Sequence, residues 1–571
     1  MKLRALAAIV LGFAVMLVVP GHAFAVAQEP CLRPAPGSIA AQPEDLRSHD
    51  GVLELQLTYR NFKAADGQEH YCYQYKDGSQ APTLRLRPGD LLVLRLKNEL
   101  TGSLPAAVRS AAHHNAPASS SSFCASSQMN ALATNLHFHG TTVPPVCHQD
   151  DVLHTLIQPG DPPFEYRFRI PGDEPPGLYW YHPHVHGFTN QQVLGGASGA
   201  LIVEGIERAN KALAGLPEQV FVVRDQELLH AEAPVADAAL NPPPPVLRDA
   251  EGDILNTGTG GGKPAKDLSI NFVPVPFPKY PPAVIPVKPS QRQLWRVLNA
   301  SALTYLDLQV VVNGSPLSMG VVSLDGVPIN EAGMARDRVL WVDHVFLPPA
   351  GRVEFIFKGT PPGANARLIT RSVDTGPAGE NDPARPLASI VTSEQAPEPA
   401  LRLSASSAPL PSSPLVWLGN VRPVRTRKLY FSERPEDPNR PGSPTVFMIT
   451  VDGQTPAPFD PHSAQPGIIA RQGEVEEWVI ENRSRESHAF HIHQLHFLLM
   501  QWDGVPVDEP FLRDTINVPY WDGKSPRYPS VTLRMDFRNP DAVGTSVYHC
   551  HLLEHEDGGM MGVIRILPGA R

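Results

Sequence analysis

The stretch that decides the fold lies near the end of the chain and reads GTSVYHCH, residues 544–551. Side chains on a β-strand alternate between its two faces, so His549 and His551 would share one face and Cys550 would take the other. The stretch GLYWYHPH, residues 177–184, has the same spacing, with a proline at the position of the cysteine. The chain is therefore expected to contain two related β-domains that use the same kind of strand.

A second internal repeat extends this organisation. A basic residue, a turn and an apolar stretch lead, eleven positions later, to an asparagine, and the pattern occurs at residues 87–98, 288–299 and 471–482. Constant spacing at these separations predicts three related β-domains. Alternation of apolar and polar side chains, as over residues 84–87, is typical of sandwich strands.

The composition agrees with this prediction. The chain has 571 residues, 42% apolar and 19% charged, which is typical of proteins that bury cores. Its 62 prolines and 44 glycines disfavour helix interiors. We predict an all-β protein of three tandem Greek-key β-sandwich domains, at residues 28–207, 208–398 and 399–571.

Three segments have compositions typical of linkers or insertions. Residues 232–266 and 374–414 are rich in proline with glycine, alanine or serine, and they are candidate domain boundaries. Residues 115–128 include four consecutive serines and are expected to form a surface insertion.

The N-terminus has the pattern of a secretory signal peptide. Lys2 and Arg4 precede an apolar run over residues 5–19, and the cleavage pattern AFA follows at residues 23–25. The run is shorter than the ~20 apolar residues that cross a bilayer. We expect residues 1–25 to be removed and the mature chain to be exported, to the periplasm or outside the cell, without a membrane span.

The five cysteines suit an oxidising compartment, where disulfides form. Cys31, Cys72, Cys124 and Cys147 lie in the first quarter of the chain and allow three pairings. Cys550 stands alone and requires a different role.

Ten histidines form four compact clusters, all in the first and third repeats. A His-x-His pair on a strand presents both imidazoles to one face. Four such clusters together predict a metal site with several ions and are not expected of isolated core histidines. In chain order these histidines are His137, His139, His182, His184, His488, His491, His493, His549, His551 and His555.

Two kinds of metal site are expected. A thiolate, two imidazoles and a weak axial thioether are the ligands of a type 1 blue copper, and Cys550, His488, His555 and Met560 supply them. The other eight histidines come equally from the first and third domains, which predicts a shared site at the interface of those domains. Zinc is the alternative metal, but zinc sites close at four ligands and leave so many histidines unexplained.

With these motifs the chain resembles the three-domain multicopper oxidases, the group of laccases, bilirubin oxidases and cuprous or ferrous oxidases. The resemblance implies three cupredoxin-like domains and four copper ions. One would be a type 1 copper in the third domain, and three would form a trinuclear cluster between the first and third domains. The ligands it implies are His137 and His491 for type 2 copper; His139, His182, His184, His493, His549 and His551 for the type 3 pair; and His488, Cys550 and His555, with Met560 axial, for type 1 copper.

The resemblance also implies how the residues act. A reducing substrate would give single electrons through His488 and Cys550, and four electrons would reduce dioxygen to water. Protons must reach the cluster, and Glu556, directly after a type 1 ligand, resembles the acidic residue with this role in bacterial members. Asp150 and Asp151, beyond the first His-x-His pair, are further candidates.

The sequence indicates the type of reaction more clearly than it indicates the electron donor. The ten methionines form no methionine-rich insert of the kind that binds Cu(I), so we expect a laccase-like oxidation of phenols or aromatic amines. Oxidation of Cu(I) or Fe(II) is the alternative, since Asp503, Asp508 and Glu509 could bind a cation. A copper-free assembly protein of the cell envelope is a further alternative, against which the complete ligand set argues.

Few partners are expected beyond dioxygen and this small reducing substrate. The formal net charge is −10, so the chain has no large basic surface to bind phosphates. We therefore do not expect nucleic acid as a partner. We expect the mature chain to be a monomer.

Overall fold

The computed structural model describes residues 30–76, 78–102, 123–125, 129–234, 247–248, 254–255, 262–329, 338–405, 415–440, 443–461 and 465–569. The predicted signal peptide and most of the predicted insertion at 115–128 lie outside these residues. Across the described residues, strands dominate and the helices are short. The prediction of an all-β protein is confirmed.

Two sheets form an N-terminal sandwich, with strand orders β1-β4-β9-β8-β6 and β3-β2-β5-β7. One continuous apolar cluster that includes Tyr59, Leu94 and Phe138 fills the space between them. The strands are β1 (Asp45–Arg47), β2 (Val52–Lys63), β3 (Glu69–Gln74), β4 (Thr83–Leu86), β5 (Leu91–Asn98), β6 (His137–His139), β7 (Phe164–Arg169), β8 (Gly177–His182) and β9 (Gly199–Val203).

A middle sandwich follows, built from the paths β14-β13-β10-β16-β23-β19-β20 and β15-β25-β24-β17-β18. Strands β21 and β26 join the first of these sheets, and β22 joins the second. The strands are β10 (Pro217–Gln226), β13 (Asp267–Ile270), β14 (Val273–Val275), β15 (Ala283–Val287), β16 (Arg292–Asn299), β17 (Leu306–Val312), β18 (Ser315–Leu317), β19 (Met319–Leu324), β20 (Val327–Pro328), β21 (Leu340–Val342), β22 (Val345–Leu347), β23 (Arg352–Lys358), β24 (Ala366–Thr370), β25 (Arg385–Thr392) and β26 (Leu401–Arg402).

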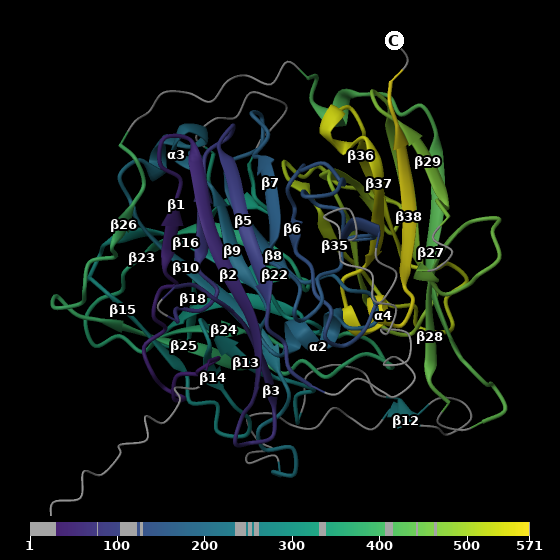
Figure 1. Ribbon diagram of the computed structural model, residues 1–571. Coiled ribbons are helices and arrows are strands. Elements are labelled where there is room, and N and C mark those ends of the chain that lie inside the picture. Colours follow the sequence, from purple (N-terminus) through teal and green to yellow (C-terminus); the bar gives the residue numbers. More distant parts are fainter. Residues whose placement is uncertain are drawn as a thin grey trace, which may run out of the picture.

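The C-terminal sandwich has the strand orders β28-β27-β30-β36-β32-β33 and β29-β38-β37-β31-β35, and β34 pairs with β32. Figure 1 shows it in green to yellow, with β35 and β37 on the side toward β6 of the N-terminal sandwich. The strands are β27 (Thr426–Pro435), β28 (Thr445–Val451), β29 (Ile468–Arg471), β30 (Val475–Asn482), β31 (His488–Ile492), β32 (Phe497–Trp502), β33 (Val505–Pro506), β34 (Leu512–Arg513), β35 (Thr515–Val518), β36 (Ser530–Asp536), β37 (Gly544–Cys550) and β38 (Met561–Leu567).

The remaining elements are short connections. Strands β11 (Leu247–Arg248) and β12 (Ile254–Leu255) pair only with each other among the described residues. The helices are η1 (Phe123–Ala125), α2 (Thr189–Leu194), α3 (Ile206–Ala209), η2 (Lys211–Leu213), η3 (Leu418–Asn420), η5 (Pro540–Ala542) and α4 (Leu553–Asp557). Among the described residues, no helix has the length and apolar character needed to span a membrane.

The predicted threefold repeat is present in the sandwiches. Strands β5, β16 and β30 each end at the asparagine of the repeat, and each pairs in parallel with the first long strand of its sandwich, β2, β10 or β27. The side-chain carbonyls of Asn98, Asn299 and Asn482 each accept the N–H two residues later. Their side-chain amides donate to loop carbonyls, those of Leu132, Pro348 and Glu486. Each asparagine thus ties a strand end to the loop beside it. The residue boundaries of the three domains stay a prediction.

The two predicted linkers differ in their places. The segment 232–266 leads from β10 to β13, which are antiparallel neighbours in one sheet of the middle sandwich, so it does not separate two sandwiches. The segment 374–414 contains β25 and β26 of the middle sandwich and is followed by β27 of the C-terminal sandwich. Proline-rich composition therefore does not by itself mark a domain boundary, because loops that leave a sheet edge have the same composition as linkers between domains.

Disulfides resolve the pairing that the cysteine spacing left open. Cys31 is bonded to Cys72 and Cys124 to Cys147, both in the N-terminal part of the chain. Cys550 is free and buried. Its separate role is taken up below.

Candidate metal centre

Two pairs of neighbouring strands carry the cluster histidines. In the N-terminal sandwich β6 pairs with β8, and His137 lies opposite His182. In the C-terminal sandwich β31 pairs with β37, and His491 lies opposite His549. Each of the eight histidines is at most 3% exposed; the other four are His139, His184, His493 and His551.

The two halves meet ring against ring. His137 stacks on His493 with ring centroids 3.8 Å apart, and His139 stacks on His491 at 3.9 Å. In each stack one ring comes from the N-terminal sandwich and the other from the C-terminal sandwich. The structure therefore brings the eight histidines together at the interface where the sequence predicts a shared site.

The ring nitrogens of this cluster point at one another across the interface. The Nε2 of His549 lies 3.4 Å from the Nε2 of His184 and 3.3 Å from the Nε2 of His493. In three further groups of buried residues, the possible ligand atoms all lie within 4.8 Å of one another. The groups are His137 with His491 and His493; His137 with His139 and His182; and His139 with His491 and Asp514.

Unpaired nitrogens show that the cluster suits metal ions. His182 and His491 each donate Nδ1–H to a backbone carbonyl at 2.8 Å, that of Pro183 or Asp514, and the Nε2 of each is buried without a partner among the described residues. An imidazole held on one nitrogen with the other free is the arrangement of metal-ligating histidines. The further cluster nitrogens that are buried without a partner are Nε2 of His137, Nδ1 of His139, Nδ1 of His493 and both nitrogens of His551.

The electrostatics of the cluster keep these rings neutral. Burial lowers the pKa of all eight imidazoles, to about 3 for His182 and to about 4 for His549. A neutral imidazole offers a lone pair, whereas an imidazolium offers none. The cluster is therefore ready to bind cations.

A second group of possible ligands lies beside the cluster in the C-terminal sandwich. The Nδ1 atoms of His488 and His555 are 3.1 Å apart, and the Sγ of Cys550 is 3.5 Å and 3.8 Å from them. Met560 is fully buried, and its carbonyl accepts the N–H of Cys550. The four residue types of the predicted type 1 site thus lie together.

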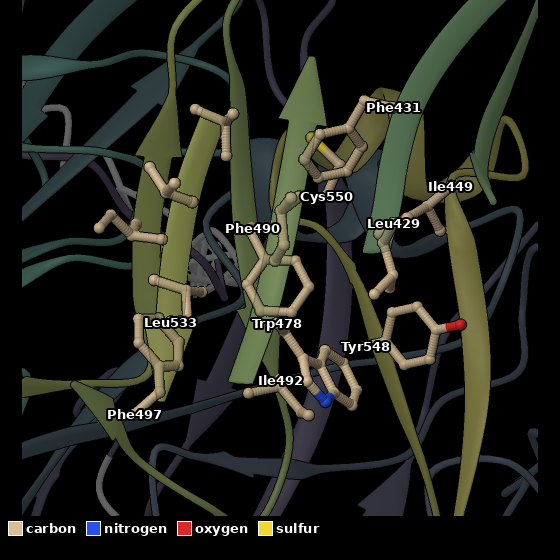
Figure 2. Packing of buried hydrophobic residues seen from close by; sticks show 14 of the residues in the cluster. Leu429, Phe431, Ile449, Trp478, Phe490, Ile492, Phe497, Leu533, Tyr548 and Cys550 are labelled. Atoms are coloured by element: carbon tan, nitrogen blue, oxygen red, sulfur yellow. The ribbon is translucent and has the colours of Figure 1, made fainter. Parts of the chain in front are cut away.

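Cys550 and its two neighbours face opposite surroundings, as alternation predicts. Figure 2 shows Cys550 beside Phe431 and near Phe490, in the apolar core of the C-terminal sandwich, whereas the rings of His549 and His551 contact histidines of the N-terminal sandwich. Burial raises the pKa of the Cys550 thiol, so a thiolate forms there only with a bound cation.

Two carboxyl groups that the sequence analysis missed lie at the outer edges of this second group. The Nε2 of His488 is 2.7 Å from Ser484 Oγ and 3.0 Å from Glu433 Oε1. The Nε2 of His555 is 3.3 Å from Glu486 Oε1, and burial together with the Glu433 carboxylate raises the pKa of Glu486. Glu486 could have been found from the sequence, because it lies two residues before the candidate ligand His488. Glu433 could not, because it lies on the distant strand β27.

The predicted proton donors occupy different places. Glu556 is fully buried, with Oε1 3.6 Å from His184 Nδ1 and Oε2 3.7 Å from His549 Nδ1, and burial and the Asp557 carboxylate hold its pKa well above the usual range. It therefore lies between histidines of both sandwiches, in surroundings that favour its protonated form.

The two aspartates beyond the first histidine pair differ in their contacts. Both Asp150 oxygens are 3.0 Å from His137 Nδ1, and Asp150 accepts a hydrogen bond from Gln494 of the other sandwich. Asp151 instead accepts from Nδ1 of the half-exposed His154 at 2.8 Å. Asp150 thus contacts the cluster directly, and the contacts of Asp151 are with a side chain outside it.

The middle sandwich also reaches the cluster, through an ion pair that sequence spacing did not reveal. Arg352, at the start of β23, donates from both Nη atoms to the two carboxylate oxygens of Asp514, at 2.8 Å and 2.5 Å. Asp514 Oδ1 is 3.1 Å from His139 Nε2, and its carbonyl holds His491. Although burial opposes it, the Arg352 guanidinium lowers the pKa of Asp514. One aspartate therefore orients a histidine from each half of the cluster, His139 through its carboxylate and His491 through its backbone carbonyl.

We expect Asp514→Asn to destabilise the protein by about 3 kcal/mol, because it removes the bidentate partner of the fully buried Arg352 and leaves only the Asp325 carboxylate, 3.7 Å away. The same change releases His139, so bound metal should also be lost. Urea unfolding and elemental analysis of the purified variant measure the two effects. Asp508→Asn, on an exposed loop, is the matched control; equal stability and metal content in both variants would contradict the role given to Asp514.

Sequence comparison identifies relatives of this chain. Two family descriptions, both "Multicopper oxidase", match residues 127–208 and 437–570. The multicopper oxidase mco of Staphylococcus haemolyticus is 22% identical over 510 residues, which cover 86% of this chain and 83% of that protein. The laccase of Bacillus subtilis is 22% identical over 416 residues, or 69% of this chain and 71% of that protein.

A solved structure has the same fold over nearly the whole chain. The multicopper oxidase of Campylobacter jejuni, described as a metallo-oxidase, superimposes with a TM-score of 0.62 at 24% identity and covers 94% of this chain and 96% of its own. The matched family segments contain all the histidines of the cluster. The chain belongs to the multicopper oxidases, copper-dependent oxidoreductases that pass electrons to dioxygen.

Proposed function

We propose that this enzyme oxidises its donor at a type 1 copper held by His488, Cys550, His555 and Met560, and reduces dioxygen to water at three coppers held by the eight cluster histidines. The observation that carries the proposal is the position of Cys550, which joins the first group directly to His549 and His551 of the second. Bound copper would supply one-electron chemistry in the first group and multi-electron reduction of dioxygen in the second. The mature chain would act as an exported monomer, and its two disulfides suit an oxidising compartment.

Glu556 is proposed to supply protons to the cluster. Its carboxyl lies between the Nδ1 atoms of His184 and His549, and Thr189 Oγ1 is 3.4 Å from Oε1. Asp150 is the second candidate because it touches His137. Asp151 is the weakest, since its contact is with His154.

The donor site proposed here is a cavity of about 320 Å³ beside His488. Its lining includes Tyr305, Phe346 and Trp502, together with Ser487 and Asn517. Ser487 directly precedes the ligand, and Asn517 pairs with the residue that follows it. The size is at the lower end of the range for drug-sized ligands.

Two features of this cavity favour phenols or aromatic amines. Aromatic walls stack on an aromatic donor. In addition, Asn517 Oδ1 is buried without a partner among the described residues and would accept a phenol O–H or an amine N–H. The preferred function is therefore a laccase-like oxidation.

Oxidation of a metal ion is the second candidate because Glu433 and Glu486 lie at the outer edges of His488 and His555. Carboxylate oxygens are suitable ligands for Fe(II), and the Campylobacter jejuni protein of similar fold is described as a metallo-oxidase. Two of the acids considered from the sequence have other partners: Asp503 accepts the N–H of Ser530, and Glu509 binds Arg513.

Replacing the thiolate tests the two-site proposal. We expect Cys550→Ser to abolish the blue colour and donor oxidation, because a hydroxyl cannot supply the copper–thiolate transition. The matched control is His493→Ala, which should keep the colour and lose dioxygen reduction. Visible absorption, copper content and oxygen consumption measure these effects; a colourless copper-loaded wild type, or turnover by both variants, would overturn the proposal.

We expect Glu556→Gln to slow oxygen reduction about 10-fold or more, because it removes the carboxyl proton while keeping the shape of the side chain. Because its pKa is raised, wild-type Glu556 keeps its proton to higher pH than an ordinary carboxyl and loses it as pH rises further, so the variant should also lose that part of the pH profile. Oxygen consumption against pH is the measurement. Glu554→Gln, exposed on the same helix, is the control; identical profiles for the two variants would count against proton supply by Glu556.

The donor class is tested by two variants and three donors. We expect Trp502→Ala to raise the KM for a methoxyphenol about 10-fold, through lost stacking, with Fe(II) and Cu(I) oxidation unchanged. Glu486→Gln should leave phenol oxidation unchanged. The metal-ion function would instead be established if the wild type oxidised a metal ion faster than any phenol. In that case Glu486→Gln should slow the oxidation of the metal ion and Trp502→Ala should not.

A further inference from the structure

A smaller cavity, of about 140 Å³, lies away from the histidine cluster, between the N-terminal and middle sandwiches. Its lining comes from β3, from the end of α2, and from β10 and the β13–β14 turn, and it includes Arg33, His70, Arg224 and Phe272. Nothing in the proposed oxidase reaction uses these residues.

Two guanidinium groups bring positive charge to this cavity. Arg224 is 3% exposed, and it donates from Nε and Nη2 to the hydroxyl and carbonyl of Ser198, both at 2.7 Å. Arg33 donates to Gln80 Oε1 at 3.0 Å and to the carbonyl of Gly195 at 2.7 Å. These partners are all neutral, and they use two of the five N–H donors of each guanidinium.

No carboxylate of the described residues forms an ion pair with Arg33 or Arg224, although three line the cavity. Glu69 accepts from Asn61 at 2.6 Å, and Glu227 pairs with Lys266 at 2.9 Å. The third, Asp225, accepts backbone N–H groups of the loop that follows β16. The acids are thus engaged elsewhere.

The two guanidinium groups lie close enough to affect each other and their neighbour His70. Burial lowers the pKa of both guanidinium groups, and the positive charge of Arg33 further lowers the pKa of Arg224. His70 carries no compensating charge, because burial and Arg33 lower its pKa to about 4. Two like charges held together in a covered site are costly unless an anion joins them.

The backbone around the cavity holds the two arginines in place. Both guanidinium carbons lie over the ring of Phe272, at 4.4 Å and 3.9 Å from its centroid, and Phe272 itself has a φ of +66°, which is unusual for a bulky residue. A side chain at Gly196 would collide with Arg33. The Cys31–Cys72 disulfide fixes the segment that carries Arg33 against β3. The arrangement is therefore built and is not a chance meeting of surface side chains.

We propose that this cavity binds a small oxyanion, such as phosphate, sulfate or a short carboxylate, between Arg33 and Arg224. Planar guanidinium groups with free N–H donors match the oxygens of such anions, often through paired hydrogen bonds. The volume is far below that of pockets for drug-sized ligands, so a nucleotide is excluded as the occupant. The bound anion joins the N-terminal sandwich to the middle sandwich.

Thermal unfolding of the copper-loaded protein tests this proposal. At constant ionic strength set with sodium chloride, saturating phosphate or sulfate should raise Tm by about 2–4 °C. Acetate in a third arm separates carboxylate from tetrahedral anions. Equilibrium dialysis with labelled phosphate should show about one ion per chain, with blue colour and oxygen consumption unchanged.

Variants at the two arginines show where the anion binds. Arg33→Gln and Arg224→Gln should each lose the Tm shift, whereas Arg87→Gln, whose side chain is 74% exposed, should keep it. If Arg224→Gln fails to fold, the partly exposed Arg33→Gln decides the result. The proposal is overturned if none of the three anions shifts Tm, or if the shift survives Arg33→Gln.

Discussion

The rest of the molecule depends on the burial of eight neutral imidazoles between two β-sandwiches. Seven of their ring nitrogens have no partner among the described residues, and each such buried polar atom costs about 1–3 kcal/mol. Metal ions that accept these lone pairs remove the cost, so binding of copper and stable docking of the two sandwiches are coupled. This coupling explains why the ligands are divided between two parts of the chain.

The middle sandwich contributes no cluster histidine, yet buried charges connect it to both neighbours. Glu218 accepts from Arg85 of the N-terminal sandwich and from Arg296 of its own, at 2.7 Å and 2.8 Å. Arg352 holds Asp514 of the C-terminal sandwich. Such pairs tolerate little displacement, because losing one partner leaves a charge buried alone. The middle sandwich thus sets the geometry of a site to which it supplies no ligand.

Under the proposed function, the two faces of β37 would separate the chemistry of the donor from that of dioxygen. One face lies in an apolar core beside the proposed donor cavity, and the other lies in the closed histidine cluster. A bulky donor would then not need to enter the cluster where dioxygen is reduced. The anion cavity lies apart from both faces, in line with a role in joining sandwiches and not in catalysis.

The sequence by itself determined the all-β class, the threefold repeat, the twelve metal-binding candidates and the opposite directions of Cys550 and His549. These follow from alternation along single strands and from residue chemistry, which are local properties. The tertiary structure alone decided the disulfide pairing, the placing of β10 and β13 on either side of residues 232–266 in one sheet, the contact of Asp150 with His137, and the placement of Glu433. It also decided the pairing of Arg352 with Asp514 and of Arg33 with Arg224. Each of these joins residues on different strands or sandwiches, and no spacing along the chain records which strands become neighbours when the sheets close.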